Sequence, residues 1–307
     1  MKVAIIGGTG FVGLHITRQL LASGHVPRLL VRPGSESKVE QPASCEIVHG
    51  EVRDLPSLVE CVRGCDAVIY LIGILREFPA RGITFEALQY QGVVDTIAAA
   101  RENCVGRFIL MSANGVRPDG TAYQRTKYRA EQALKASGLR WTIFRPSVIF
   151  GDPEGRMEFC SQLKKDIIDS PLPAPLFHAG LLPTKAGLFE LAPVSIKDVA
   201  AAFVLALSES RTESQTYSLC GPERLSWKAI LETIAAASGR TKWMVPAPAL
   251  AIKAAAGLFD RFPWFPISRD QIQMLMEGNV CTENDSFARL GLTPTRFGID
   301  QLGYLTR

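Results

Sequence analysis

The sequence feature that most constrains the fold is a glycine-rich turn close to the start of the chain. Before it, the apolar residues 3–6 are bounded at once by glycine, which predicts a buried parallel strand. After it, apolar residues recur at helical spacing from Phe11 to Leu21, and Gly24 predicts the end of that helix. The turn between them contains three glycines, Gly7, Gly10 and Gly13. A strand, a tight turn and a helix in so short a stretch predict the first unit of a parallel sheet.

The spacing of the three glycines predicts a dinucleotide site. In such turns the first glycine lets the backbone turn sharply, the second lets it approach a pyrophosphate, and the third lets the helix pack closely on the strand. The free N–H groups at the start of the helix then bind the pyrophosphate. Because a strand precedes these glycines and a helix follows them, the local context favours binding over a turn without a ligand.

Predicted strands and helices alternate through the first half of the chain. Further strands are predicted at residues 29–31, 45–49, 67–72, 107–112 and 141–145, and helices at about 85–103 and 123–137. Such alternation indicates crossover units on a parallel sheet with helices on both faces. We therefore predict an α/β protein with a Rossmann-type doubly wound parallel sheet over residues 1–150. A smaller, mostly helical C-terminal substrate region is predicted over residues 151–307.

The residue after the second predicted strand bears on the choice of dinucleotide. Arg32 stands nineteen residues after Gly13, where proteins that bind NAD(H) commonly have an acidic residue that bonds the ribose hydroxyls. An arginine there suits the 2′-phosphate of NADP(H). Ser35 and Lys38 would add donors to that phosphate, whereas Glu36 in the same loop would oppose it. The sequence therefore favours NADP(H), with NAD(H) as the alternative.

A serine, a tyrosine and a lysine form the predicted catalytic group. Ser112 ends the fifth predicted strand, and Tyr123 and Lys127 begin the next helix four residues apart, on one helical face. A nearby ammonium favours the phenolate, so the pKa of Tyr123 is predicted to be lowered toward the working pH. Tyr123 would exchange a proton with a substrate oxygen held by Ser112, while Lys127 also reaches the nicotinamide ribose. The alternative is a surface tyrosine without a function, and Tyr128 is predicted to face elsewhere.

Together these motifs resemble the short-chain dehydrogenase/reductase superfamily, in its extended or atypical, NAD-dependent epimerase/dehydratase-like branch. The resemblance rests on the glycine run 7–13, Ser112, the pair Tyr123 and Lys127, and the segment 145–151. Residues 192–200 resemble the branch's return from the substrate domain, so residues 192–220 are expected to rejoin the core. Residues 70–73 and 108–114 look most like the group around the nucleotide-binding accessory subunit of respiratory complex I.

The resemblance implies a role for each motif residue. The pyrophosphate site would consist of Gly7, Thr9, Gly10, Phe11, Val12 and Gly13. Arg32 would bind the 2′-phosphate, and the adenosine side would be bounded by Leu71, Ile72 and Gly73. Tyr123 and Lys127 would lie near the nicotinamide ribose. A wall beside the nicotinamide would consist of Pro146, Ser147, Val148 and Ile149.

One departure from the superfamily pattern bears on catalysis. No asparagine stands ready for the proton relay that much of the superfamily uses, and Gln91 occupies the helix region where it would be expected. Several relatives in the accessory-subunit group bind the dinucleotide as a structural element. The first hypothesis is an NADP(H)-dependent oxidoreductase acting on a small, fairly apolar substrate. The alternatives are a non-catalytic NADP(H)-binding accessory or assembly module of a respiratory or membrane complex and, third, a sugar-nucleotide epimerase or dehydratase.

The C-terminal region contains two unusual stretches. Residues 152–191 are rich in proline without regular periodicity, which is typical of a functional loop, and His178 within it is more simply a loop residue than an acid. Residues 246–266 are nearly uncharged and end in aromatic residues, so they pack on the core or contact a membrane surface or a partner subunit. This apolar character, without an arginine cluster for a nucleotide diphosphate, favours an apolar small-molecule substrate.

Composition narrows the remaining classes of function. The balance of 34 basic and 30 acidic residues gives a net charge of +4, which is too mild to indicate nucleic-acid binding. Seven cysteines at irregular spacings predict free thiols and no metal site. No run of apolar residues is long enough to predict a membrane span, and the first strand leaves no room ahead of it for a signal peptide. We therefore expect a cytoplasmic protein, with association at a membrane surface through residues 246–266 as an alternative.

Overall fold

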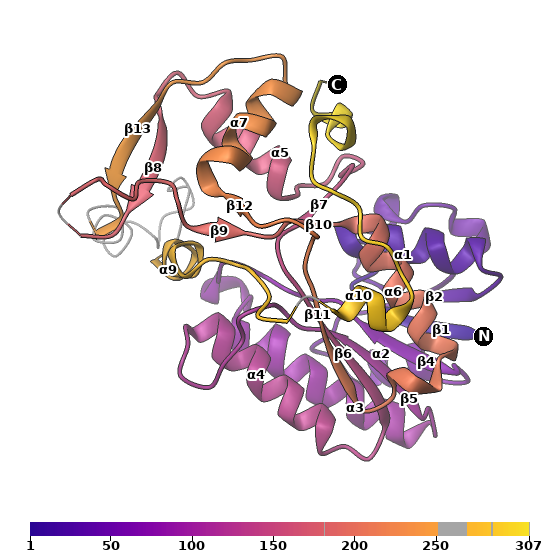
Figure 1. Cartoon of the computed structure of the whole chain (residues 1–307). Helices are drawn as coiled ribbons and strands as arrows, with labels where there is room; N and C mark the ends of the chain where they lie inside the picture. The colour runs from indigo at the N-terminus through magenta and orange to yellow at the C-terminus, as the bar shows by residue number, and fades with distance from the viewer. Residues whose placement is uncertain (181, 251–268, 284, 307) are drawn as a thin grey trace. The chain divides into compact units, whose positions relative to one another are not determined.

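The computed structural model describes residues 1–180, 182–250, 269–283 and 285–306. The chain folds as two compact units (Figure 1). Unit 1 consists of Met1–Pro146, Ile196–Leu219 and Ser286–Leu292. Unit 2 consists of Ser147–Ser195, Cys220–Asp285 and Thr293–Arg307.

Unit 1 is built on a sheet of seven strands in the order β11-β6-β5-β4-β1-β2-β3, and every neighbouring pair is parallel. The strands are β1 (Lys2–Ile6), β2 (Val26–Val31), β3 (Glu46–His49), β4 (Ala67–Tyr70), β5 (Arg107–Met111), β6 (Arg140–Pro146) and β11 (Gln215–Leu219). The strand order reverses between β1 and β4, and sheets of this kind bind ligands beyond the carboxyl ends of the strands at that point. The predicted Rossmann-type sheet is confirmed.

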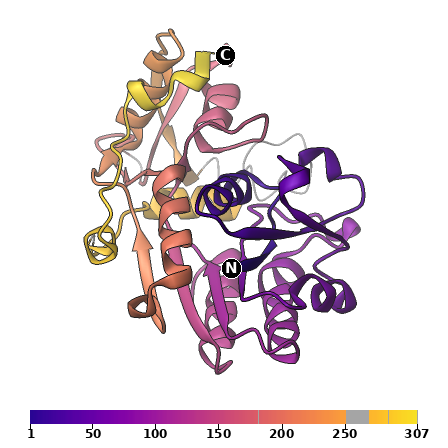
Figure 2. The ribbon, with the colours of Figure 1, turned by 90° about the vertical axis from the view of Figure 1, so that its right-hand side faces the viewer.

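Helices cover both faces of this sheet (Figure 1, Figure 2). They are α1 (Phe11–Ala22), α2 (Leu55–Val62), α3 (Gly92–Glu102), α4 (Ala122–Lys135), α6 (Ile196–Ser208) and the short α10 (Ser286–Leu290). Helix α1 packs against α6, whereas α2 packs against α3 and α3 against α4. In β1, Ala4 and Ile6 point into the cluster formed with α2, α3 and α4, and Ile5 between them is also fully buried. Burial on both faces explains why β1 reads as a continuous apolar run.

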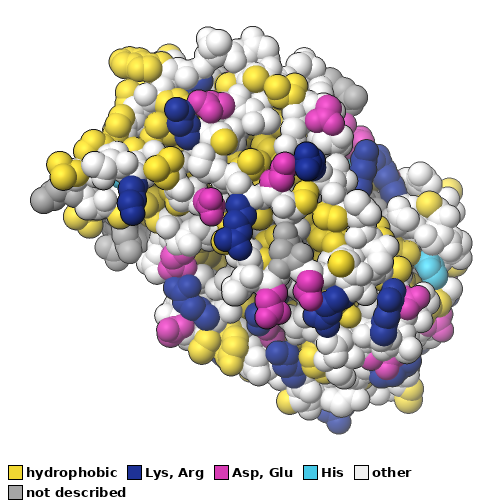
Figure 3. Space-filling view, viewed as in Figure 1, with side chains coloured by type: hydrophobic (Ala, Val, Ile, Leu, Met, Phe, Trp, Pro, Cys, Tyr) yellow, Lys and Arg dark blue, Asp and Glu magenta, His cyan; other side chains and the backbone are white. Residues whose placement is uncertain are grey.

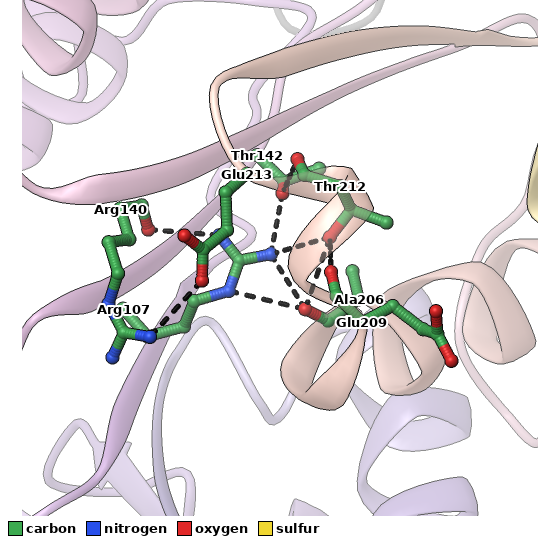
Figure 4. A network of polar contacts seen from close by, with 7 residues as sticks. All are labelled: Arg107, Arg140, Thr142, Ala206, Glu209, Thr212 and Glu213. Atoms are coloured by element: carbon green, nitrogen blue, oxygen red, sulfur yellow. Dashed lines mark hydrogen bonds and ion pairs between the residues drawn. The ribbon is translucent and has the colours of Figure 1, made fainter.

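A buried arginine ties one edge of the sheet together (Figure 4). Arg107 at the start of β5 is 2% exposed, and its guanidinium donates to the carbonyl oxygens of Ala206 (2.6 Å) and Arg140 (2.9 Å). It also donates to Oγ1 of Thr142 (2.6 Å) and of Thr212 (3.0 Å). Burial lowers the pKa of Arg107 to about 10. The network therefore satisfies the donors of a buried cation with oxygen atoms from β6, α6 and the turn before β11.

Unit 2 combines short helices with pairs of strands. Its helices include α5 (Phe159–Leu163), the π-helix η5 (Lys164–Ile168), α7 (Trp227–Ala237) and α9 (Arg269–Glu277). The paired strands are β7 (Ile149–Phe150) with β10 (Val194–Ser195), β9 (Glu190–Leu191) with β12 (Leu225–Ser226), and β8 (Ala174–His178) with β13 (Met244–Pro248). The indole of Trp227 stacks near the rings of Phe177 and Phe189, with centroids 6.0 and 5.7 Å away. Most of the predicted apolar segment 246–266 lies outside the described residues.

A disulfide in unit 2 corrects the expectation of free thiols. Cys220 and Cys281 are bonded across a sequence separation of 61 residues, with their Cα atoms 6.0 Å apart. Both are buried, and the backbone between them is held because Ala192 N–H donates to Asn279 O and Gly221 N–H donates to Ala192 O. The spacing of these two cysteines in the sequence does not predict the bond, because they approach each other only when three distant segments of the chain are brought together. The other five cysteines are free thiols.

The described residues contain neither a membrane-spanning helix nor a cluster of metal-binding side chains. No helix in the described ranges is both long and apolar enough to cross a membrane. Within the same part of the chain, no group of three or more His, Cys, Asp or Glu side chains is placed to hold a metal ion.

Candidate functional site

The glycine turn lies between β1 and α1 and is shaped for close approach to its backbone. Gly7 has φ 98°, a left-handed conformation that favours glycine. A Cβ atom on Gly13 would lie 2.3 Å from the carbonyl oxygen of Gly7 and 2.6 Å from the Cα of Gly8, so only glycine fits there. Gly10 caps α1 without a side-chain hydrogen bond, and the first turn of the helix contains no acidic residue. The N–H groups and the positive end of the helix dipole therefore suit an anion.

The end of β4 lies directly against this turn. A Cβ atom on Gly7 would lie 3.2 Å from a side-chain carbon of Ile72, and Leu71 N–H donates to the carbonyl of Ile6 at 2.9 Å. A Cβ on Gly73 would lie 3.6 Å from Nζ of Lys127. The structure thus brings residues 71–73, predicted for the adenosine side, between the glycine turn and the predicted catalytic lysine.

Helix α4 places Tyr123 and Lys127 in its first turns, next to the end of β5. A capping box of Thr121 and Gln124 fixes the start of the helix. Lys127 is 4% exposed, its Nζ donates to the carbonyl of Met111 (3.2 Å), and it lies 5.7 Å from the ring centroid of Tyr123. The Tyr123 ring also meets the ring of Phe85 edge-to-face, with centroids 5.8 Å apart.

Ser112, the residue after β5, has an unused hydroxyl. Its side chain is 3% exposed, and Oγ has no hydrogen-bond partner, although its backbone N–H donates to the carbonyl of Phe144 (2.7 Å). A buried polar atom without a partner is costly and calls for an explanation. A substrate oxygen bonded to this hydroxyl would supply the missing partner.

The electrostatics of the pair correct one expectation. Burial raises the pKa of Tyr123, so the predicted lowering by the neighbouring lysine is wrong. The physical reason is that loss of water destabilises the phenolate, and the ammonium of Lys127 is turned toward the carbonyl of Met111. Burial also lowers the pKa of Lys127 to about 8, while the negative charge of Glu131 acts in the opposite direction.

Glu131 is fixed one helical turn beyond Lys127. It is fully buried, and its carboxylate accepts two hydrogen bonds from the guanidinium of Arg145 on β6, one of them from Nε at 2.8 Å. This bidentate pair joins α4 to the last residues of the strand β6. Lys127 therefore lies on a helix face whose position relative to the sheet is set by an ion pair.

The loop after β2 carries the residues predicted to choose between the two coenzymes. Arg32 is exposed, and the N–H of Ser35 donates to its carbonyl at 2.9 Å. The carboxylate of Glu36 lies 3.5 Å from Nδ1 of His49 at the end of β3. Farther along the loop, Glu40 accepts two hydrogen bonds from Arg18 on α1 (2.6 and 2.8 Å). The loop is thus attached to the helix that begins at the glycine turn.

Comparison with known proteins agrees with this geometry. A family model described as NAD(P)H-binding matches residues 7–167, which is more than half of the chain. The chain belongs to this NAD(P)H-binding family. The matched range includes the glycine turn, Arg32, the end of β4 and the group Ser112, Tyr123 and Lys127.

Individual proteins and solved structures are also similar to this chain. The mitochondrial NADH-ubiquinone oxidoreductase 40 kDa subunit of Neurospora crassa is 26% identical over 304 residues, covering 94% of this chain and 75% of that protein. A ceramide reductase of Caulobacter vibrioides is 31% identical over 150 residues, covering 48% of this chain and 46% of that protein. A solved structure of UDP-glucose 4-epimerase from Thermus thermophilus with NAD has a TM-score of 0.74 at 20% identity, covering 100% and 98% of the two chains, which shows the shared fold. The resemblance inferred from the sequence motifs is confirmed.

The residues of unit 1 fit an NAD(P)H molecule. A Cβ atom on Gly10 would meet only the carbonyl oxygen of Gly7, at 3.4 Å, so the backbone there is open to a pyrophosphate, and the buried Oγ of Ser112 is free to bond a polar group of a ligand. Not all predicted contacts lie in unit 1. Pro146 ends β6 and accepts from Asn114 N–H (2.9 Å), whereas Ser147, Val148 and Ile149 belong to unit 2. The hydroxyl of Ser147 donates to the carbonyl of Ala192, so it has a structural partner.

Gln89, rather than Gln91, is the buried glutamine of this region. Gln91 does not point inward; its amide donates to Asp95 on the exposed face of α3 (2.8 Å). Gln89 is instead 1% exposed, and its amide donates to the carbonyl of Ile74 (2.7 Å) while Thr126 Oγ1 donates to its Oε1 (3.4 Å). Residues Glu86–Gln91 form a π-helix, whose wider turn shifts the buried face relative to the 3.6-residue period. Periodicity alone gives no signal for this shift.

Proposed function

We propose that this protein is an NADP(H)-dependent oxidoreductase that transfers a hydride between the nicotinamide and a carbon of a small, fairly apolar substrate. The observations that support this most directly are the buried Ser112, whose hydroxyl has no partner, and the buried Lys127, which lies beside Gly73 and 5.7 Å from the ring centroid of the half-buried Tyr123. Burying an ammonium group costs free energy, and buried lysines with a shifted pKa are found most often at functional sites.

The geometry supports a separate role for each of these residues in the reduction of a carbonyl group. When bound, NADPH supplies the hydride. Ser112 would donate a hydrogen bond from Oγ to the substrate oxygen, and Tyr123 would transfer its phenolic proton to that oxygen as negative charge develops. Because burial raises the pKa of Tyr123, its phenol holds the proton until the oxygen becomes basic. The ammonium of Lys127 would stabilise the phenolate that remains.

Titration with the two coenzymes tests this proposal. Calorimetry on the full chain is expected to show tighter binding of NADPH than of NADH. Arg32→Ala should weaken NADPH about tenfold or more and change NADH less than about twofold, because only NADPH carries the 2′-phosphate that a guanidinium bonds. Gly10→Ala should weaken both coenzymes by about tenfold or more, because its Cβ would point toward the pyrophosphate.

Gly106→Ala serves as the control for the Gly10→Ala variant. The nearest atom to a Cβ on Gly10 is the carbonyl oxygen of Gly7 at 3.4 Å, an ordinary contact, so the variant is expected to fold normally. Gly106→Ala, outside the turn, should leave both affinities unchanged. If neither coenzyme produces a heat of binding, the proposal is rejected. Tighter binding of NADH would point instead to the epimerase or dehydratase hypothesis.

The protonation of Lys127 predicts a pH dependence of turnover. Its pKa is lowered to about 8, so the ammonium is present below that pH and is lost as the pH rises through it. We expect kcat/KM for NADPH-dependent reduction to fall above pH 8, approaching about tenfold per pH unit. Glu131→Gln removes the negative charge that favours the ammonium and should move this fall in kcat/KM to lower pH. If kcat/KM of Glu131→Gln falls over the same pH range as that of the wild type, a group other than Lys127 controls the pH dependence.

A second candidate is a non-catalytic accessory or assembly module of a respiratory or membrane complex. Its support is the match to the Neurospora complex I subunit, which extends over 94% of this chain. This candidate predicts coenzyme binding without consumption and co-purification with a large membrane complex, with contact through residues 246–266 or another surface. Steady consumption of NADPH with a carbonyl substrate would favour the oxidoreductase.

A further inference from the structure

Exposed apolar side chains are concentrated around one pair of strands in unit 2. Among the described residues, four large hydrophobic side chains are at least 70% exposed: Leu172 (70%), Leu182 (71%), Trp243 (74%) and Leu250 (78%). All four flank β8 or β13, which pair in parallel. Figure 3 shows hydrophobic side chains gathered over these two strands. We call these four residues the apolar rim.

Two members of the apolar rim line a pocket of about 470 Å³. Leu172 lies two residues before β8, and Trp243 directly precedes β13. Their segments are held side by side because the N–H of Ala174 donates to the carbonyl of Trp243 at 2.8 Å. Proline on either side of Leu172 restricts the backbone that presents it. The backbone that carries the indole and the leucine is thus held in place at the surface of unit 2, and all residues that line this pocket belong to unit 2.

Two basic residues, Arg240 and Lys242, line the same pocket. Lys242 lines it and donates to the carbonyls of Ile168 (3.3 Å), the last residue of η5, and of Ser170, two residues later. Arg240 also lines it and lies 3.4 Å from the carboxylate of Asp169, which accepts a second ion pair from Lys164. Over residues 164–173 and 240–243, four basic residues stand against two acidic ones, a net charge of +2. No acidic side chain lines the described pocket.

We infer that this face of unit 2 docks on an anionic lipid surface. An indole and leucines beside lysine and arginine are the combination that interfacial binding uses, with apolar side chains entering the acyl boundary and cations at the headgroups. A free phosphate would engage the cations only and would leave the apolar rim in water. The inference is independent of the coenzyme chemistry, since the glycine turn, Tyr123 and Lys127 are all in unit 1.

Vesicle co-sedimentation with the full chain tests the inference. Wild-type protein should bind vesicles of phosphatidylcholine with phosphatidylserine more strongly than vesicles of phosphatidylcholine alone, and added salt should weaken the binding. The double variant Leu172→Ser/Trp243→Ser should reduce binding to the anionic vesicles about fivefold or more, because apolar insertion is lost. Both residues are exposed, so the variant should bind NADPH like the wild type.

A matched control uses exposed hydrophobic residues elsewhere. Leu55→Ser and Ile299→Ser change side chains that are 43% and 55% exposed, and neither flanks β8 or β13, so binding to anionic vesicles should be unchanged. The inference is overturned if the wild type does not bind anionic vesicles at low salt, or if the double variant binds as well as the wild type. Equal loss in the control variants would also overturn it. None of these outcomes bears on coenzyme binding, which is measured separately.

Discussion

Replacing Tyr123 with phenylalanine is expected to lower turnover about 10³-fold while the affinity for NADPH stays within about twofold of wild type. The variant removes only the phenolic hydroxyl. Its ring would keep the edge contact with Phe85 and the position next to the ammonium of Lys127, so the fold of α4 should persist. Proton delivery to the substrate oxygen would be lost, because the Ser112 hydroxyl is a far weaker acid than is needed to replace the phenol. NADPH absorbance with a carbonyl substrate gives the rate, and calorimetry gives the affinity.

Tyr128→Phe is the matched control for this experiment. Tyr128 lies on the same helix, one residue after Lys127, and faces another direction around the helix axis. Its replacement should leave turnover unchanged. If Tyr123→Phe retains wild-type turnover, the tyrosine has no part in proton transfer. If NADPH affinity falls with turnover, the tyrosine acts mainly in holding the coenzyme.

Removing the disulfide is expected to destabilise the protein by about 4 kcal/mol. Cys220 and Cys281 close a loop over a sequence separation of 61 residues, and opening it restores conformational entropy to the unfolded chain. The Cys220→Ser/Cys281→Ser variant should therefore unfold at a lower urea concentration than the wild type. Unit 1 contains neither cysteine, so NADPH binding below the unfolding transition should be retained.

Cys104→Ser is the control for this comparison, because Cys104 is an exposed free thiol. It should unfold at the wild-type urea concentration. Reduction of the wild type with dithiothreitol should reproduce the shift of the double variant and leave the double variant itself unchanged. Equal unfolding midpoints for wild type and double variant would show that the disulfide does not stabilise the protein.

Local signals in the chain anticipate the elements that position the coenzyme. The glycine turn, the apolar run of β1 and the helix that follows depend on neighbours within a few residues, and all three form where the sequence predicts them. The seven-stranded sheet agrees with the predicted alternation of strands and helices. In α4, the four-residue spacing of Tyr123 and Lys127 brings the ammonium to 5.7 Å from the ring, as helix geometry requires.

Other features of the site depend on the environment of each side chain, and spacing does not report it. The sequence suggests that Lys127 should lower the pKa of Tyr123, yet burial of the phenol dominates and raises it. Gln89 rather than Gln91 is buried, because the π-helix shifts the inward face. The sequence does not predict the apolar rim either, because Leu172 and Trp243 are 71 positions apart and are brought together only by the pairing of β8 and β13.

The amino-acid sequence by itself determined the Rossmann-type sheet, the glycine turn and the identity of the NAD(P)H-binding family, because each is encoded by residues close together along the chain. Only the tertiary structure decided the Cys220–Cys281 bond, the orphaned hydroxyl of Ser112 and the buried network of Arg107. These three depend on which distant segments exclude water from one another, and that is a property of the packed chain as a whole.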